Sequence, residues 1–415
     1  MHPNTLEAIL SNTRRCIRTL SLRGLDAAPP WSILHSLRPT HGGQLPGLTS
    51  LDLRGCRSFT DSDLLHLLRI VPNLRCVNMK GLQRVNRAVL KQLATARVVE
   101  RVDLSRCGVD MDGLGKYLSR LDTEQMARMK VFRCAGVKGR GRAVRDVAAS
   151  LGQMRNLEVL DLGGTSLDDE SVHAWIDSYT AGRSIQGASG RSADDDLVTL
   201  DRLRHLRLTG CDHLSPAALK ALTGRLPCLE SFELAAVPKF LRSAHTHDHT
   251  ASQTRHQLAR DRQAVASFFA SCEGLRRVDL DDFGTRDGGV SNEMLEALEG
   301  EVIEEVHIAE SGAGVDVECM VRFVRRCKHL RVFNVDVSWL APGGSCLFLL
   351  RHSSIPPTRR PLWHSLWRPL SNGCASAGGH VGRSGTRSHD PSRRGRVHLL
   401  TPVNRRRRSR PHGMA

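Results

Sequence analysis

The chain has 415 residues, enough for two or three ordinary domains or for one long array of repeats. Its 60 Lys and Arg residues against 43 Asp and Glu residues give a formal net charge of +17, typical of proteins that bind nucleic acid or an anionic membrane. Hydrophobic residues make up 40% of the chain, which excludes a wholly disordered protein. No apolar run approaches the roughly 18–20 residues of a membrane span and no signal peptide is visible, so we expect an intracellular protein, cytoplasmic or nuclear, without membrane contact.

Residues 1–16 precede the first repeat and predict an N-terminal cap, because Leu6, Ile9 and Leu10 suffice for one short amphipathic helix. A repeated pattern then runs over residues 17–340. Segments that start at Leu48 and Leu203 fit L-x-x-L-x-L-x-x-C, the segment that starts at Val99 fits it with valine at the first two leucine positions, and looser copies bring the total to about eleven. Self-similarity at such a period is the signature of a solenoid.

Each copy predicts a short strand followed by a helix. The L-x-L alternation places two apolar residues on one face of a strand. Between repeats, Leu64, Leu67 and Leu68 recur at helical spacing after a capping pair formed by Thr60 and Asp63. Ser215 before Pro216 is a second helix start. Such units must stack to cover their apolar faces, so we expect a right-handed α/β solenoid curved into a horseshoe, with parallel strands on its concave side.

Residues 51–65, followed by Pro72-Asn-Leu, resemble the cysteine-containing leucine-rich repeats of the ribonuclease-inhibitor-like superfamily, as found in F-box leucine-rich-repeat proteins. The period matches that class, whose repeats have about 20–29 residues. The resemblance implies that the horseshoe holds a protein substrate while an F-box docks onto an SCF ubiquitin ligase. Residues 1–16 are too few for an F-box, so we expect either an F-box in another product of the locus or a freestanding repeat protein.

Candidate sites for metals or catalysis are few. Cys56, Cys107 and Cys211 follow the strands periodically, and we expect them to pack in the core. His245, His247 and His249 alternate in a polar segment, where they either bind a metal such as zinc or are solvated. No catalytic motif is present, so the sequence predicts no enzyme and no cofactor.

The central residue of each L-x-L is expected to face the concave side. If these polar residues recognise a protein rather than solvate the sheet, the binding residues are Asp52, Asn78, Asp103, Arg133, Asp161, Arg207, Glu233, Asp279 and His307, with Ser21 and Asn334 at the ends of the row.

Two insertions and a tail complete the chain. We expect loops at residues 180–201 and 238–262, where the interval between repeats lengthens. Residues 341–415 contain 14 Arg, one Asp and no Lys, and predict a disordered basic tail or the product of out-of-frame translation. Without this tail the chain is nearly balanced in charge, so nucleic acid is a partner only through the tail.

The leading functional hypothesis is protein recognition by the horseshoe, as substrate recognition in SCF-type ubiquitin-dependent degradation. A ligase-independent scaffold or inhibitor is the main alternative. Binding of nucleic acid through the tail is the third.

Overall fold

The computed structural model describes residues 16–24, 44–187, 199–237, 240–241, 251–284, 289–298, 301–309, 314–336 and 345–349. The chain divides into two units, Met1–Ser353 and Ser354–Ala415, and all of the described residues belong to the first.

One sheet runs through this unit, and its strands follow one another in chain order. The first eleven strands are parallel, and the last pairs antiparallel with the eleventh. The strands are β1 (Thr19–Ser21), β2 (Ser50–Asp52), β3 (Cys76–Asn78), β4 (Arg101–Asp103), β5 (Val131–Arg133), β6 (Val159–Asp161), β7 (His205–Arg207), β8 (Ser231–Glu233), β9 (Arg277–Asp279), β10 (Glu305–Ile308), β11 (Val332–Asp336) and β12 (Ser345–Leu349).

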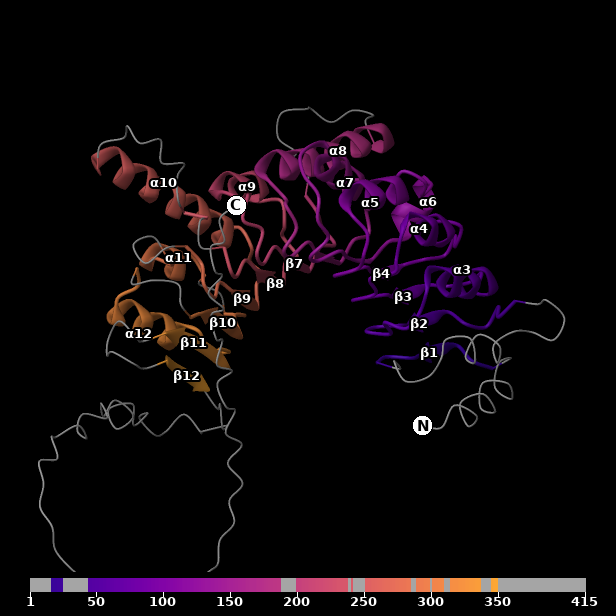
Figure 1. The fold of residues 1–415 in the computed structure, drawn as a ribbon. Helices are drawn as coiled ribbons and strands as arrows, with labels where there is room; N and C mark the ends of the chain where they lie inside the picture. Colours follow the sequence, from indigo (N-terminus) through magenta and orange to yellow (C-terminus); the bar gives the residue numbers. More distant parts are fainter. Residues whose placement is uncertain are drawn as a thin grey trace, which may run out of the picture. The chain divides into compact units, whose positions relative to one another are not determined.

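Helices connect most of these strands and lie on one side of the sheet, on the outer side of the arc that this unit makes (Figure 1). They are α3 (Asp61–Ile70), α4 (Arg87–Leu93), α5 (Met111–Leu118), α6 (Thr123–Arg128), α7 (Arg142–Leu151), α8 (Asp169–Gly187), α9 (Pro216–Leu222), α10 (Ala251–Ala270), α11 (Asn292–Ala297) and α12 (Val317–Arg326). The alternation of parallel strands and helices confirms the predicted α/β solenoid of leucine-rich-repeat type.

The strands form where the sequence alternates. Leu51 and Leu53 are buried, while Asp52 between them is only half-buried and lies on the opposite side of β2. The predicted capping pair at the start of α3 is also confirmed. Thr60 caps α3 by accepting a hydrogen bond from the Asp63 backbone N–H (3.2 Å), and the Asp63 carboxylate accepts one in return from the Thr60 N–H (2.9 Å).

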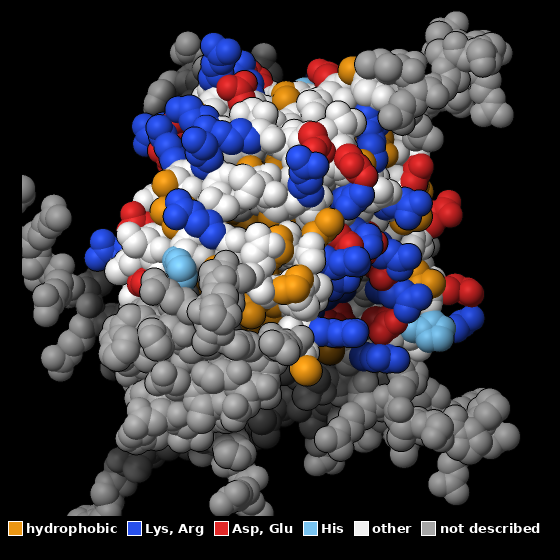
Figure 2. Space-filling view, turned by 90° about the vertical axis from the view of Figure 1, so that its right-hand side faces the viewer, with side chains coloured by type: hydrophobic (Ala, Val, Ile, Leu, Met, Phe, Trp, Pro, Cys, Tyr) orange, Lys and Arg blue, Asp and Glu red, His pale blue; other side chains and the backbone are white. Residues whose placement is uncertain are grey.

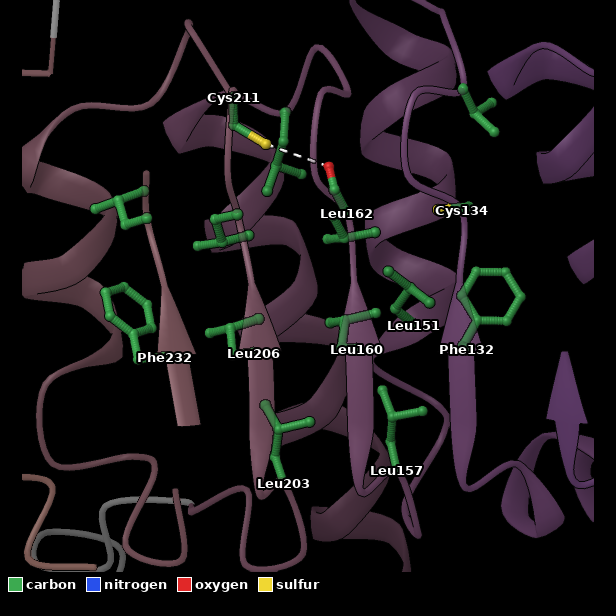
Figure 3. Close-up of a cluster of buried hydrophobic side chains, with 14 of the residues drawn as sticks. Phe132, Cys134, Leu151, Leu157, Leu160, Leu162, Leu203, Leu206, Cys211 and Phe232 are labelled. Atoms are coloured by element: carbon green, nitrogen blue, oxygen red, sulfur yellow. Dashed lines mark hydrogen bonds between the residues drawn. The ribbon is translucent and has the colours of Figure 1, made fainter. Parts of the chain in front are cut away.

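Leucine and phenylalanine side chains fill the space between strands and helices, and Figure 3 shows how they line up from strand to strand. The cysteines that follow the strands join this core, as expected. Each thiol donates to a backbone carbonyl of the preceding repeat: Cys56 to Leu22 (2.7 Å), Cys107 to Met79 (3.0 Å) and Cys211 to Leu162 (3.2 Å). Burial raises the pKa of Cys107 to about 12 and that of Cys211 to about 11, so these thiols stay neutral and structural.

After each of the strands β1–β9 the chain turns through a residue with positive φ. Glycine occupies this position in most repeats, and Gly81 has a φ of 81°. Its backbone N–H donates to the carbonyl of Ser105 in the next repeat (2.9 Å), so the turn extends the ladder between repeats. Arg106, Ala236 and Asp282 occupy the same position with φ near 55°, a conformation that costs a non-glycine residue about 1–2 kcal/mol.

Two expectations about insertions are wrong in part. Helix α8 continues through residues 180–187 of the first predicted loop, and residues 251–262 of the second form the first part of α10. The polar composition of α10 concealed it, because apolar residues at helical spacing are concentrated around Val265, Phe268 and Phe269. Residues 188–198 and the histidines at 245, 247 and 249 lie outside the described residues.

The predicted disordered tail also needs correction at one place, because β12 lies inside it and pairs with β11. Strand β11 offers an edge with free backbone groups, which an adjoining segment satisfies by pairing. Residues 1–15 of the predicted cap and 350–415 of the tail lie outside the described residues. None of the described helices is long and apolar enough to cross a membrane.

The turn geometry yields a stability prediction. The substitution Gly81→Ala should lower the free energy of unfolding by about 1 kcal/mol through backbone strain alone, because a Cβ at Gly81 would meet no atom within 4 Å. The control is Gly115→Ala inside α5, where a Cβ would make ordinary contact with Val147 at 3.7 Å and should stabilise by about 0.5–1 kcal/mol. Thermal unfolding of the two variants should shift in opposite directions, and equal shifts would contradict the assignment of strain to the turn.

Candidate protein-binding face

The helices lie on one side of the sheet, and we call the other side the open face (Figure 1). The predicted binding residues alternate with the buried residues of the strands and therefore form a single row on the open face. Successive strands pair without offset, so each central residue is the register partner of the next. The row is Ser21, Asp52, Asn78, Asp103, Arg133, Asp161, Arg207, Glu233, Asp279, His307 and Asn334. The structure therefore brings all of the predicted residues together, and their role in binding stays a prediction.

Several of these side chains bind their own backbone. In five repeats the side-chain Oδ1 atom accepts the N–H of the second residue that follows, and the pairs are Asp52 with Arg54 (3.1 Å), Asn78 with Lys80 (3.1 Å), Asp103 with Ser105 (3.0 Å), Asp161 with Gly163 (3.0 Å) and Asp279 with Asp281 (3.2 Å). Such local bonds stabilise the turn that ends each strand. The recurrence of Asp in the L-D-L motif thus has a structural cause in addition to any role in recognition.

The side chains of the row differ in exposure. Asp103 is only 7% exposed, so it lies in the row with little access to solvent. Arg207 is exposed, and its guanidinium forms an ion pair with Glu233 on the next strand (3.0 Å). The other residues named as binding candidates are half-buried. A partner on this face would therefore reach Arg207 more readily than Asp103.

A second row of charges, which the sequence analysis missed, lies where the strands begin. From the third repeat onward the residue after the first apolar position alternates in sign: Arg75, Glu100, Lys130, Glu158, Arg204, Glu230, Arg276, Glu304 and Arg331. From Glu100 onward, the backbone N–H of each member of this row donates a hydrogen bond of 2.7–2.9 Å to the carbonyl of the previous member, one repeat earlier. The signal was present in the first x of L-x-x-L, and it emerges only when the repeats are aligned.

Ion pairs link neighbours along this second row. The distances are 3.4 Å for Arg75–Glu100, 2.9 Å for Lys130–Glu100, 2.7 Å for Arg204–Glu230, 3.1 Å for Arg276–Glu304 and 3.3 Å for Arg331–Glu304. Each exposed pair stabilises by no more than about 1 kcal/mol. If a repeat stacked on the next repeat but one, like charges would lie side by side. The alternation of charge therefore favours the observed stacking of neighbouring repeats.

Other features of the described residues do not assemble a reactive site. No group of three or more His, Cys, Asp or Glu side chains among them could hold a metal ion. A small pocket between Met154, Trp175 and Leu203 has room for about one water molecule. On the surface seen in Figure 2, basic and acidic side chains adjoin one another, so charge is distributed as a mosaic.

The backbone bond of Asp161 can be tested by substitution. The substitution Asp161→Ala removes the acceptor of the Gly163 N–H and should lower the free energy of unfolding by about 1 kcal/mol. In the control, Asp161→Asn keeps Oδ1 as an acceptor and should retain most of the stability. If the two variants melt at the same temperature in calorimetry, the bond has no structural role.

The charge row also predicts a pH dependence. A hydrogen bond from Lys130 lowers the pKa of Glu100 below its usual 4.5, against the opposing effect of burial. Because the folded pKa is the lower one, the stabilisation is complete above about pH 4.5 and is lost as the pH falls through the folded value. The stability difference between wild type and Lys130→Met should be constant from pH 7 to 5 and shrink below. A difference that stays constant down to pH 3 would rule out this coupling.

No family model matches the chain, and no curated protein matches it. Among solved structures, the crystal structure of the Rad7 and Elc1 complex in yeast aligns at 16% identity with a TM-score of 0.46, covering 77% of this chain and 79% of that one. The tropomodulin C-terminal domain of Caenorhabditis elegans aligns at 12% identity with a TM-score of 0.25, covering 45% of this chain and 98% of that one.

Proposed function

We propose that this chain is a protein-recognition module that binds a partner polypeptide on its open face. One observation carries the proposal. The eleven parallel strands are covered by helices on one side, and none of the described helices lies over the other (Figure 1). Parallel sheets are normally covered on both faces, so a polar face that none of the described helices covers is suited to a bound partner.

The chemistry of the face supports binding rather than catalysis. Its side chains are ion-paired carboxylates and guanidinium groups, such as Arg207 with Glu233, and carboxylates that hold backbone N–H groups. Charges arranged in this way select a complementary partner and reject others. We therefore propose a binding protein and not an enzyme.

More specifically, we propose that the module recognises substrates for an SCF-type ubiquitin ligase. The support is the resemblance of residues 51–65 to repeats of F-box leucine-rich-repeat proteins. Its partners would then be a protein substrate on the open face and ligase subunits elsewhere. A ligase-independent scaffold or inhibitor would use the same face without those subunits.

Affinity purification with a matched pair of variants tests the role of the face. The substitution Arg207→Glu should lower recovery of a partner protein by about tenfold, because it reverses one exposed charge of the face. The control is Arg145→Glu on α7. The side chains of Arg207 and Arg145 are 49% and 48% exposed, and each forms an ion pair of 3.0 Å, with Glu233 and Glu170 respectively. Equal recovery by the two variants would contradict recognition through the open face.

The same purification tests the ligase assignment. If the module is a substrate receptor, an SCF adaptor and cullin should be recovered with the wild-type chain. They should also be recovered with Arg207→Glu, because the ligase contacts would lie outside the open face. Loss of the substrate in Arg207→Glu without any ligase subunit in the wild-type sample would favour the scaffold.

A further inference from the structure

Three basic side chains stand in one row at the first strands of the open face. They follow the central residue of an L-x-L motif by two positions. Arg23 follows Ser21 of β1, Arg54 follows Asp52 of β2, and Lys80 follows Asn78 of β3. The backbone ladder continues beside them, because the N–H of Gly24 donates to the Arg54 carbonyl (2.9 Å) and that of Gly55 to the Lys80 carbonyl (3.1 Å). Like charges are thus held at the spacing of adjacent strands, about 4.8 Å.

Little within the described part of the chain neutralises these charges. Arg54 pairs with Asp52 (2.8 Å), and Asp103 lies close enough to act on Arg54 as well. Arg23 and Lys80 are exposed, and no described residue forms an ion pair with either of them, although the charge of Asp52 acts on Arg23 as well as on Arg54. We call Arg23, Arg54 and Lys80 the basic section of the face.

Farther along the face, at β8 and β9, acidic side chains outnumber basic ones. Glu233 on β8 and Asp279 on β9 are register partners, and Asp281 follows two residues later, while Arg277 at the start of β9 forms an ion pair with Glu305 (3.5 Å). Between the two regions, the row that contains Arg23, Arg54 and Lys80 continues with small uncharged residues, namely Ser105, Ala135, Gly163, Thr209 and Ala235. The open face therefore changes from basic at its first strands to acidic at β8 and β9.

We propose that the basic section binds an acidic segment of a partner polypeptide across strands β1–β3. The inference rests on the proposed function and specifies the partner's chemistry. Two gaps between three strands span about 10 Å, the length of about four extended residues. Carboxylates on alternate residues of such a segment lie about 7 Å apart, a mismatch with the strand spacing that the long Arg and Lys side chains can bridge. The acidic residues at β8 and β9 repel the same segment.

The composition of the face favours an acidic polypeptide over nucleic acid. Asp52 and Asp103 lie close to these basic side chains and would repel a continuous phosphate backbone. None of the described open-face positions on the parallel strands carries Phe, Tyr or Trp, the rings on which bases stack.

Carbodiimide cross-linking tests the proposal in the full chain. The probe is a short capped peptide in which Asp alternates with Gly, and carbodiimide joins its carboxylates to lysine amines. Residues 341–415 contain no lysine, so a probe held by the arginines of that segment leaves no product there. The matched internal control is Lys91, an exposed lysine on α4 of the same repeat as Lys80.

We expect mass spectrometry to find the cross-link at Lys80 about tenfold more often than at Lys91. The double substitution Arg23→Glu with Arg54→Glu should lower the Lys80 yield about tenfold and leave Lys91 unchanged. The control is Arg69→Glu with Arg97→Glu, at exposed arginines in α3 and after α4 that form no ion pair with a described residue, and it should change neither yield. Circular dichroism identifies any variant that has unfolded, and 1 M salt should lower the Lys80 yield in wild type without any substitution.

Equal yields at Lys80 and Lys91, or a Lys80 yield that the Arg23 and Arg54 substitutions do not lower, would overturn the proposal. Oligothymidylate that blocks the Lys80 cross-link at lower concentration than free peptide would overturn it in favour of nucleic acid. Another outcome is that the peptide gives no preferential cross-link at Lys80 while Arg207→Glu still loses its protein partner. In that case protein recognition by the open face stands, and only the proposal of an acidic partner segment is wrong.

Discussion

Each three-residue strand bonds to the strand of the next repeat without any offset, and the other features of the molecule depend on this register. It holds the central residues in one row from Ser21 to Asn334. It also places the thiol of Cys211 against the carbonyl of Leu162 in the core (Figure 3). A shift by one residue along a strand would move the apolar side chains of the core to the open face. Packing and the position of the candidate site are therefore fixed by the same hydrogen bonds.

The register explains which parts of the structure the sequence could predict. Apolar residues at fixed spacing predict the strands, and the position of Asp161 on the open face follows from alternation alone. The bond from the Gly163 N–H to that carboxylate does not follow, because it requires the turn geometry after the strand. The alternating charges escaped notice because Arg204 and Glu230, which form an ion pair, are 26 residues apart in the chain.

The incorrect predictions concern segments in which polarity hides regular structure. Asp261 lies in the part of α10 that was expected to be a loop, yet it is buried and accepts a hydrogen bond from Gln257 one turn earlier (2.8 Å). Burial raises the pKa of Asp261, against the opposing effect of this hydrogen bond. A helix that buries polar side chains in this way has no clear apolar stripe in its sequence. Strand β12 was missed for a different reason. A segment that pairs with an open strand edge does so through its backbone groups, so it needs no repeat motif in its sequence.

The division of charges between paired and unpaired groups is a sharper guide to function than the net charge of +17. Carboxylates such as Glu100 and Glu304 each form ion pairs with basic residues of both neighbouring repeats, so these charges contribute mainly to the stacking of repeats. Arg23 and Lys80 take no part in that row and form no ion pair with a described residue, although the charge of Asp52 acts on Arg23. Side chains that no ion pair holds in place are available for a partner, and on the open face Arg23 and Lys80 are such side chains at the first strands.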